Sequence, residues 1–443
     1  MYEKEFNFIF DFAKDKADDI EILLSANNSF SVRINKQEIE SFNYADAKGI
    51  GVRVIKDGKV GYSYTEQFEE ATFKNIVNEA LENAKYTEDS EIVILENHPS
   101  IDTKLNVYSE ELDKVDVIKK IKFSKNLEKI ALETDKRVFN VPYALMGNST
   151  TYSKIANSKG LDKEEKYNAA YAYVVSLTQE KDDKRVGLEF VIGRDFSKFD
   201  AKKMAEKSVE KSTSLLGGEC IESGSYSVVF NNEMMATMLA TFSGIFSAKA
   251  VQEGKSLLKG KLNETIANNI VTIIDDALHP DGLASRSFDS EGYPSQTNIL
   301  IENGTLKTFL QNTQTARKDG VNSTGNGSRT YKGTLEIAHS NFFLKPGTCK
   351  EEELLGQHDK TIEIVALQGM HSGANTISGD FSLSGEGFLY ENGTRKHSLK
   401  QFTVSGNILK LLQDVEIIAD NFKFNMSSIG AASVLVKELA ISG

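Results

Sequence analysis

The sequence predicts an α+β protein of two domains, and three observations lead to this prediction. Its 443 residues exceed what one ordinary hydrophobic core accommodates. Helical and strand-like patterns alternate in the first half, whereas glycine-rich strands dominate the second half. The pair Gly217-Gly218 follows a predicted helix, so a linker is expected there. We therefore assign residues 1–217 to an N-terminal α/β-type domain and residues 218–443 to a strand-rich C-terminal domain.

Apolar side chains in the first domain follow two periods. Residues 6–13 place apolar side chains at helical spacing, whereas residues 30–34 alternate apolar and polar side chains as a strand does. The Asp57-Gly58 pair between two apolar runs is typical of a tight hairpin turn. These patterns predict a mixed sheet with helices, and the helices are expected near residues 6–13, 73–84, 115–132 and 200–215.

The second domain begins with a predicted strand at residues 227–230 and a helix over residues 232–250. Beyond this helix, two similar segments each carry an Asn-Gly pair between alternating flanks, at Asn303-Gly304 and Asn392-Gly393. Two such hairpins within a glycine-rich region predict a sandwich or barrel-like sheet with one or two helices.

Composition excludes several classes of function. The net charge of −12 and the absence of a concentrated basic run argue against direct nucleic-acid binding. The longest apolar stretch, around residues 234–246, is too short to span a membrane, and residues 1–20 do not resemble a signal peptide. Cys220 and Cys349 are too few for a disulfide framework. We therefore expect a cytoplasmic protein without nucleic-acid or membrane partners.

No local motif holds a metal ion, a nucleophile or a phosphate group. None of the six histidines lies one helical turn from another, so no His-Glu-x-x-His arrangement exists. A Gly-x-Ser-x-Gly nucleophile turn is absent, and the glycine-rich segment 323–329 lacks the Gly-Lys-Ser/Thr ending of a nucleotide loop. A metal site assembled from distant residues stays open at this point.

Asp289 and Glu291 form one pair of acids with two interpretations. On an extended strand both carboxylates would face the same side, where they could share a proton or bind a cation. Alternatively, they accept backbone hydrogen bonds in a turn that ends at Gly292. The second interpretation is favoured, because short acidic side chains commonly bond to nearby backbone groups.

An ordered series of motifs resembles the TldD/PmbA family, whose members are often labelled modulators of DNA gyrase. The series consists of Phe288-Asp289-Ser290-Glu291-Gly292, then Leu300-Ile301-Glu302-Asn303-Gly304, then Thr324-Gly325-Asn326 with Arg329. Segments 274–276, 378–381 and 404–407 also fit, and the first half fits more loosely.

The family has two branches, and the resemblance sorts this chain into one of them. TldD-type members are implied zinc peptidases with His-Glu-x-x-x-His on the first helix of the C-terminal domain and a cysteine ligand near the C-terminus. Here the matching helix reads Ala240-Thr241-Phe242-Ser243-Gly244-Ile245, and residues 421–430 contain no cysteine. The resemblance therefore implies the PmbA/TldE branch, with no catalytic residue and no metal ligand, and with zinc expected only in a TldD-like partner.

The resemblance further implies a homodimer or heterodimer that encloses a chamber and binds unfolded peptides as an added strand. Its partner would be a TldD-like zinc peptidase subunit. We expect Asp289, Glu291, Asn326 and Arg329 to line the substrate cavity. Two alternatives stay open: a homodimeric peptidase with metal ligands from distant residues such as His371 and Cys349, and a peptide-binding protein without a protease partner.

Overall fold

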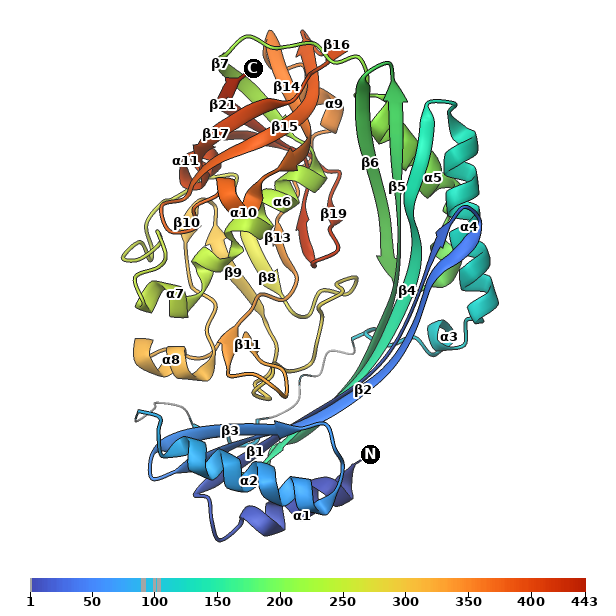
Figure 1. The fold of residues 1–443 in the computed structure, drawn as a ribbon. Helices are drawn as coiled ribbons and strands as arrows, with labels where there is room; N and C mark the ends of the chain where they lie inside the picture. The colour runs from blue at the N-terminus through green and yellow to red at the C-terminus, as the bar shows by residue number, and fades with distance from the viewer. Residues whose placement is uncertain (1, 89–92, 99–100, 102–104) are drawn as a thin grey trace.

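The computed structural model describes all residues except 1, 89–92, 99–100 and 102–104. The first half of the chain forms one long, curved sheet with helices on its outer face, and the second half packs against the concave side (Figure 1). The predicted α+β class is confirmed. Among the residues that are described, no helix is both long and apolar enough to cross a membrane.

The first sheet has six strands in the order β3-β2-β1-β4-β5-β6. Every neighbouring pair is antiparallel, so the expectation of a mixed sheet was wrong. Tight turns explain this for the first three strands: the two-residue turns at Lys36-Gln37 and Asp57-Gly58 have positive φ angles and leave no length for a crossover helix. The strands are β1 (Asp19–Asn35), β2 (Glu38–Lys56), β3 (Lys59–Thr65), β4 (Val138–Asn157), β5 (Asp162–Glu180) and β6 (Asp183–Gly193).

The helices of the first half cover two separate stretches of the outer sheet face. One hydrophobic core lies under α1 (Glu3–Ala13) and α2 (Glu70–Ala84), and a second lies under α4 (Val117–Thr134) and α5 (Ala201–Thr213). The single turn α3 (Glu110–Asp113) borders the second core through Leu112. Between the two cores the outer face carries no helix (Figure 1).

A closed barrel of five strands forms one end of the second half. Its strands pair in the ring β14-β7-β21-β17-β15, and β15 returns to β14. The barrel alternative of the sequence-based prediction is therefore the one observed. The ring consists of β7 (Gly224–Phe230), β14 (Lys360–Gln368), β15 (Asp380–Glu391), β17 (Phe402–Asn407) and β21 (Val434–Ser442), with β16 (Thr394–Ser398) and β18 (Val415–Ile418) attached.

A second sheet of the same half lies beside the barrel in the order β10-β9-β8-β13-β20-β19. Both Asn-Gly turns are confirmed, with positive φ at Asn303 and Asn392, but they serve different sheets. The strands of this sheet are β8 (Ile273–Asp276), β9 (Thr297–Glu302), β10 (Thr305–Leu306), β13 (Phe342–Leu344), β19 (Lys423–Phe424) and β20 (Ile429–Ala431). The remaining short strands are β11 (Gly327–Ser328) and β12 (Glu336–Ile337).

The helix expected over residues 232–250 is interrupted. It consists of α6 (Asn232–Phe242), a 3₁₀ turn at Ser243–Phe246 and α7 (Ala248–Gln252). Met235, Leu239 and Phe242 on α6 pack into the core between the barrel and the second sheet. The other helices are α8 (Thr313–Asp319), α9 (Glu351–Leu354), α10 (Met370–Gly373) and α11 (Ile408–Gln413).

Candidate functional site

The two halves meet where residues 328–333 lie across the concave face of the first sheet. Gly49 and Gly51 of β2 allow this close approach: a Cβ atom at either glycine would lie 2.1 Å from an atom of Tyr331. Two cavities flank Tyr331, one of about 590 Å³ towards β3 and one of about 360 Å³ towards β4 and β5. The crossing segment therefore divides the space between the halves.

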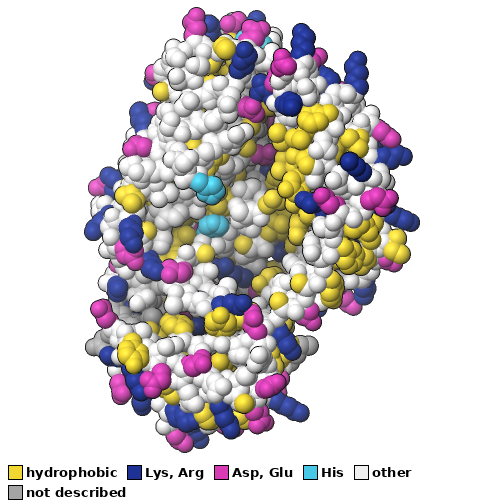
Figure 2. Space-filling view, viewed as in Figure 1, with side chains coloured by type: hydrophobic (Ala, Val, Ile, Leu, Met, Phe, Trp, Pro, Cys, Tyr) yellow, Lys and Arg dark blue, Asp and Glu magenta, His cyan; other side chains and the backbone are white. Residues whose placement is uncertain are grey.

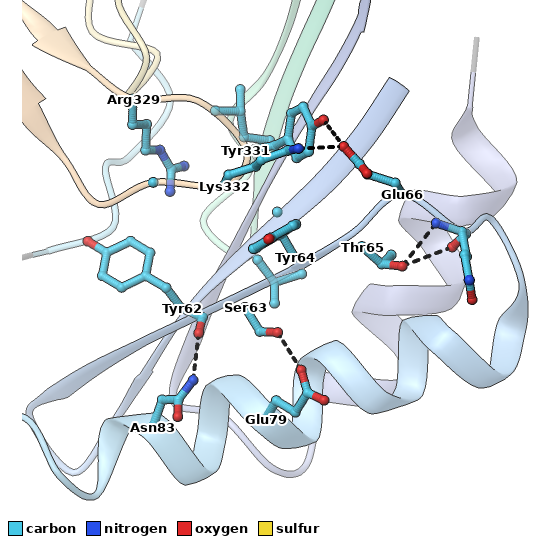
Figure 3. Close-up of a pocket in the computed structure, with 15 residues that line it drawn as sticks. Tyr62, Ser63, Tyr64, Thr65, Glu66, Glu79, Asn83, Arg329, Tyr331 and Lys332 are labelled. Atoms are coloured by element: carbon cyan, nitrogen blue, oxygen red, sulfur yellow. Dashed lines mark hydrogen bonds and ion pairs between the residues drawn. The ribbon is translucent and has the colours of Figure 1, made fainter. Parts of the chain in front are cut away.

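The larger cavity is lined by aromatic and charged side chains (Figure 3). Tyr64 of β3 contacts Tyr331 edge to face, with ring centroids 6.1 Å apart. Glu66 accepts hydrogen bonds from the Tyr331 hydroxyl and the Lys332 ammonium, each at 2.6 Å. The edge strand β3 is partly capped, because the Tyr62 carbonyl accepts a hydrogen bond from the Asn83 amide at 2.9 Å. Less of this edge is consequently available for pairing with an added strand.

The smaller cavity lies between the sheet and the loop 283–290. Glu165 of β5 faces it and accepts a hydrogen bond from the Ser287 backbone N–H at 2.9 Å. Burial raises the pKa of the Glu165 carboxyl, although its bonds to Ser287 and the charge of Arg286 oppose the shift. A carboxyl group at this place can therefore hold a proton more readily than an exposed glutamate can.

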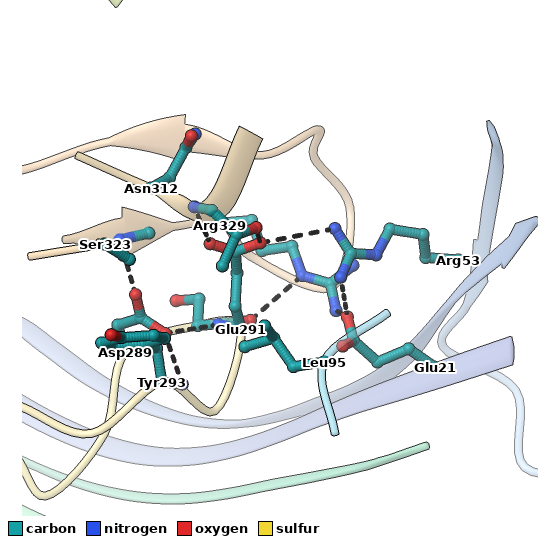
Figure 4. A network of polar contacts seen from close by, with 12 residues as sticks. Glu21, Arg53, Leu95, Asp289, Glu291, Tyr293, Asn312, Ser323 and Arg329 are labelled. Carbon is teal, nitrogen blue, oxygen red and sulfur yellow. Dashed lines mark hydrogen bonds and ion pairs between the residues drawn. The ribbon is translucent and has the colours of Figure 1, made fainter. Parts of the chain in front are cut away.

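A buried charge network joins the two halves beneath these cavities (Figure 4). Glu21 of β1 and Arg53 of β2 are opposite each other in the register, both side chains are fully buried, and the Arg53 Nη2 to Glu21 Oε1 distance is 2.9 Å. From the second half, Arg329 also pairs with Glu21, and the Glu291 carboxylate lies 3.8 Å from Arg53 Nη1. Two arginines and two glutamates from distant parts of the sequence thus form one cluster.

Burial affects the pKa values of both arginines, with different outcomes. For Arg53, Glu21, Tyr62 and Glu291 together outweigh the cost of burial, so its pKa is raised. For Arg329, burial dominates and its pKa is lowered. Both guanidinium groups stay charged near neutral pH, because the ordinary value is so high. The cluster therefore holds two permanent positive charges, with Arg53 fully buried and Arg329 almost so.

Asp289 accepts backbone hydrogen bonds in a turn, as the favoured interpretation of the acid pair predicts. Its Oδ1 atom accepts the backbone N–H groups of Glu291 and Tyr293, each at 2.9 Å, and its Oδ2 atom accepts that of Gly327 at 2.8 Å. Gly292 has a positive φ of 78°, as the end of this turn requires. Burial and the charge of Glu291 nevertheless raise the pKa of Asp289 to about 7.

The structure thus brings three of the four predicted site residues together. Asp289 and Arg329 line the smaller cavity, and Arg329 also lines the larger one. Glu291 is buried and accepts the backbone N–H of Thr313 at 2.9 Å. Asn326 is buried as well and donates to Asp275 at 2.7 Å and to the Ala338 carbonyl at 3.0 Å. Contact of these four with a substrate stays a prediction, whereas each has an intramolecular role.

Sequence reasoning missed Glu21 and Arg53. Each interrupts an apolar strand pattern, Glu21 between Ile20 and Ile22 and Arg53 between Val52 and Val54. Charged residues at such places are costly unless they are paired. A charged residue within an apolar strand pattern was therefore the signal in the sequence. Only the register of β1 with β2 shows that Glu21 and Arg53 are partners.

A third cavity, of about 630 Å³, lies over α6. Thr237, Ala240 and Thr241 of the helix face it, together with His371 of α10 and Asn425. Cys349 is elsewhere, packed at the edge of the main core. Within the described part of the chain, no group of three or more His, Cys, Asp or Glu side chains is placed to hold a metal ion.

Comparison with known proteins decides the family. Three family models match in order: PmbA/TldA metallopeptidase domain 1 over residues 20–84, the central domain over 110–216 and the C-terminal domain over 223–443. A crystal structure from Thermotoga maritima, described as a proposed modulator of a DNA gyrase, superimposes with a TM-score of 0.93 at 31% identity and covers 100% of both chains. The chain belongs to the PmbA/TldD family.

Other PmbA/TldD relatives agree with this assignment. The metalloprotease PmbA homolog of Haemophilus influenzae is 26% identical over 96% of this chain and 92% of its own length. A protein of Methanocaldococcus jannaschii is 29% identical over 89% of this chain and 90% of its own length. TldE from Thermococcus kodakarensis has a TM-score of 0.90 at 24% identity, with 99% and 100% coverage, and shares the fold.

The raised pKa of Asp289 leads to a prediction on stability. Its ordinary pKa of 3.8 rises to about 7 in the folded state, so its contribution is greatest below pH 4 and is lost as the pH rises towards 7. The free energy of unfolding of the parent, relative to Asp289→Asn, should therefore decrease over this interval. Urea unfolding of both proteins at several pH values measures the difference, and a constant difference would contradict the assignment.

Proposed function

We propose that this chain is a PmbA/TldE-type subunit of a TldD/TldE-type metallopeptidase system that acts on unfolded peptides, itself without catalytic zinc. The observation that supports this most directly is the surface of α6 over the third cavity. Thr237, Ala240 and Thr241 face the cavity there, and none of these side chains is an ordinary zinc ligand. His371 is one imidazole, and a catalytic zinc site requires three protein ligands.

In this proposal the zinc that activates water belongs to a TldD-like partner. The present chain contributes binding and enclosure of the peptide, which position the scissile bond and exclude bulk water. The cavities beside Tyr331 and the one over α6 are candidate peptide-binding surfaces. Their tyrosine, threonine and backbone groups can bind the main chain of a peptide whatever its sequence.

An exposed apolar surface supports the proposed interaction with a partner subunit. The open face of β4, β5 and β6, turned away from α4 and α5, carries apolar side chains that gather in one area (Figure 2). Tyr143 is 39% exposed, Leu188 42% and Val186 58%, and the three come from neighbouring rows of the sheet. Contiguous exposed apolar surface commonly marks an interaction site. We propose that this face contacts the second subunit of a heterodimer.

The test is co-expression with a TldD-like chain. We expect a stoichiometric complex that cleaves an unfolded peptide, at least ~tenfold faster than either chain alone, with zinc bound to the partner. Val186→Lys together with Leu188→Lys should weaken the complex, because the substitutions place charges on an apolar contact. Ile118→Lys, at an equally exposed site on α4, is the matched control.

Two outcomes would contradict this proposal. Absence of a complex at micromolar concentration would remove the partner role. About one zinc per purified chain, with peptide hydrolysis that a chelator abolishes, would instead support the homodimeric peptidase alternative. Peptide binding without turnover, in a genome that lacks a TldD-like gene, would point to the other alternative, a peptide-binding protein without a protease partner. We place the protein in the cytoplasm, and the charge of −12 makes any connection with DNA an indirect one.

A further inference from the structure

A polar row interrupts the outer face of the first sheet between its two hydrophobic cores. Along β1 this face is apolar up to Ala26 and again from Phe30, and Asn28 stands between them. Between these positions the neighbouring strands place polar residues side by side in one row. The row across β2, β1, β4 and β5 consists of Asp46, Asn28, Thr150 and Asn168.

Asp46, Asn28 and Thr150 of this row line the floor of a cavity of about 470 Å³, which lies on the side of the sheet away from the second half. Figure 1 shows the place on the outer face, between α3 and α1. Val115 and Val117, ahead of and at the start of α4, form part of the wall, and Phe30, Tyr44 and Tyr152 add aromatic surface. The cavity therefore combines a polar floor with apolar, aromatic and charged side chains around it.

Lys120 of α4 contributes a buried positive charge to this cavity. Its side chain is 4% exposed, and its Nζ atom donates one hydrogen bond, to the Asn148 Oδ1 atom at 2.7 Å. The Phe30 ring centroid lies 5.2 Å from Nζ. Among the described residues, no carboxylate pairs with this ammonium group within 4.0 Å. Burial lowers the pKa of Lys120, although the charges of Asp113 and Asp116 oppose the shift.

The donors at this wall exceed the acceptors. An ammonium group has three N–H donors, and Lys120 uses one of them on Asn148. The Asn148 side-chain NH₂ group has no acceptor within the described part of the chain. This amide nitrogen is not fully buried, so it faces the open cavity. A buried ammonium group without a carboxylate partner is costly. Two adjacent groups therefore present free donors to the cavity at one point.

The other charges of the cavity are already compensated. Asp113 accepts hydrogen bonds from Thr150 at 2.6 Å and from Tyr108 at 2.8 Å, and Lys166 is 3.4 Å away. Asp46 is exposed, so solvent screens it. Lys120 is thus a buried charge of the cavity that has no carboxylate in direct contact, although Asp113 acts on it from a longer distance. These neighbouring acids disfavour a dianion, such as a phosphate monoester, more strongly than they disfavour a monoanion.

We propose that this cavity is a binding site for a small organic carboxylate, whose carboxylate group pairs with Lys120 and Asn148 and whose apolar part lies against Phe30, Val115 and Val117. The site is separate from the cavities beside Tyr331 and over α6, because it opens on the opposite face of the sheet. It also does not depend on the proposed peptidase partnership.

The test uses phenylacetate and its neutral analogue phenylacetamide with the full-length chain. Saturation-transfer NMR and the thermal unfolding midpoint should both show saturable binding of phenylacetate, and no comparable binding of phenylacetamide. Lys120→Met should weaken phenylacetate binding by about tenfold or more, because a charge-assisted hydrogen bond is lost. Lys119→Met, at an exposed lysine of the same helix, is the matched control and should bind as the parent does.

A second variant keeps the proposal testable if Lys120→Met folds poorly. Asn148→Asp places a carboxylate beside Lys120 within the protein itself. It should raise the unfolding midpoint of the unliganded chain and abolish phenylacetate binding, because the internal carboxylate replaces the ligand's. The proposal is overturned if the parent does not bind phenylacetate, if either variant binds it unchanged, or if inorganic phosphate binds more tightly.

Discussion

The substitution Arg53→Met is expected to lower the free energy of unfolding by about 3–5 kcal/mol, because removing one partner leaves buried charges uncompensated. Arg53 is fully buried between Glu21 and Glu291, and both carboxylates lack water contact. In the variant only Arg329 stays to neutralise them, and it reaches Glu21 from the second half. Urea unfolding at neutral pH, followed by circular dichroism, measures the loss.

The same strand offers a matched control for this substitution. Lys56 of β2 pairs with Asp18 at 3.0 Å, but both side chains are more than 40% exposed. Lys56→Met should therefore cost no more than about 1 kcal/mol, as for exposed ion pairs in general. The double variant Glu21→Gln with Arg53→Met should lose less than the sum of the single losses, because it removes the unpaired charge on β1. Equal effects at positions 53 and 56 would show that burial does not govern this network.

Gly51→Ala is the second substitution with a large expected effect on stability. Its Cβ atom would lie 2.1 Å from the Tyr331 carbonyl oxygen, and backbone atoms cannot move aside as a flexible side chain can. We expect a loss of about 1–3 kcal/mol or more in the free energy of unfolding, as for overpacked interiors. Displacement of residues 328–333 from the sheet should also expose Tyr331 to chymotrypsin, which limited proteolysis detects.

Gly244→Ala is the control for this substitution. No atom lies within 4 Å of a Cβ built at Gly244, and its φ is not in the left-handed region. Its stability and cleavage pattern should match those of the parent. If Gly51→Ala also leaves both unchanged, the close contact between Tyr331 and the sheet does not hold the halves together.

Local patterns predicted the elements of this fold better than their connections. The alternation in residues 30–34 and the Asn-Gly pairs identified strands and turns, because these depend on neighbouring residues alone. The closure of the barrel was not accessible in this way, since β7 pairs with β14 and β21 far along the chain. The domain boundary at residues 217 and 218 stays a prediction.

For the candidate site, too, the sequence predicted local features but not contacts between distant residues. The sequence pointed to Asp289 and Glu291 as a pair, and a turn that ends at Gly292 was the interpretation favoured for them. Their association with Glu21 and Arg53 could not be predicted, because it depends on how the two halves pack. Lys120 was not singled out either: a lysine in a helix rich in lysines gives no indication that it is buried.

The closed ring of strands has a consequence for biosynthesis. Phe230 of β7 pairs with Val434 of β21, the last of the five strands to be made. At translation rates of about 5–20 residues per second, β7 waits roughly 10–40 s for this neighbour. During that interval the nascent barrel has unpaired strand edges, which are prone to intermolecular pairing. Slow, late folding and a need for chaperone protection should therefore accompany production of this chain.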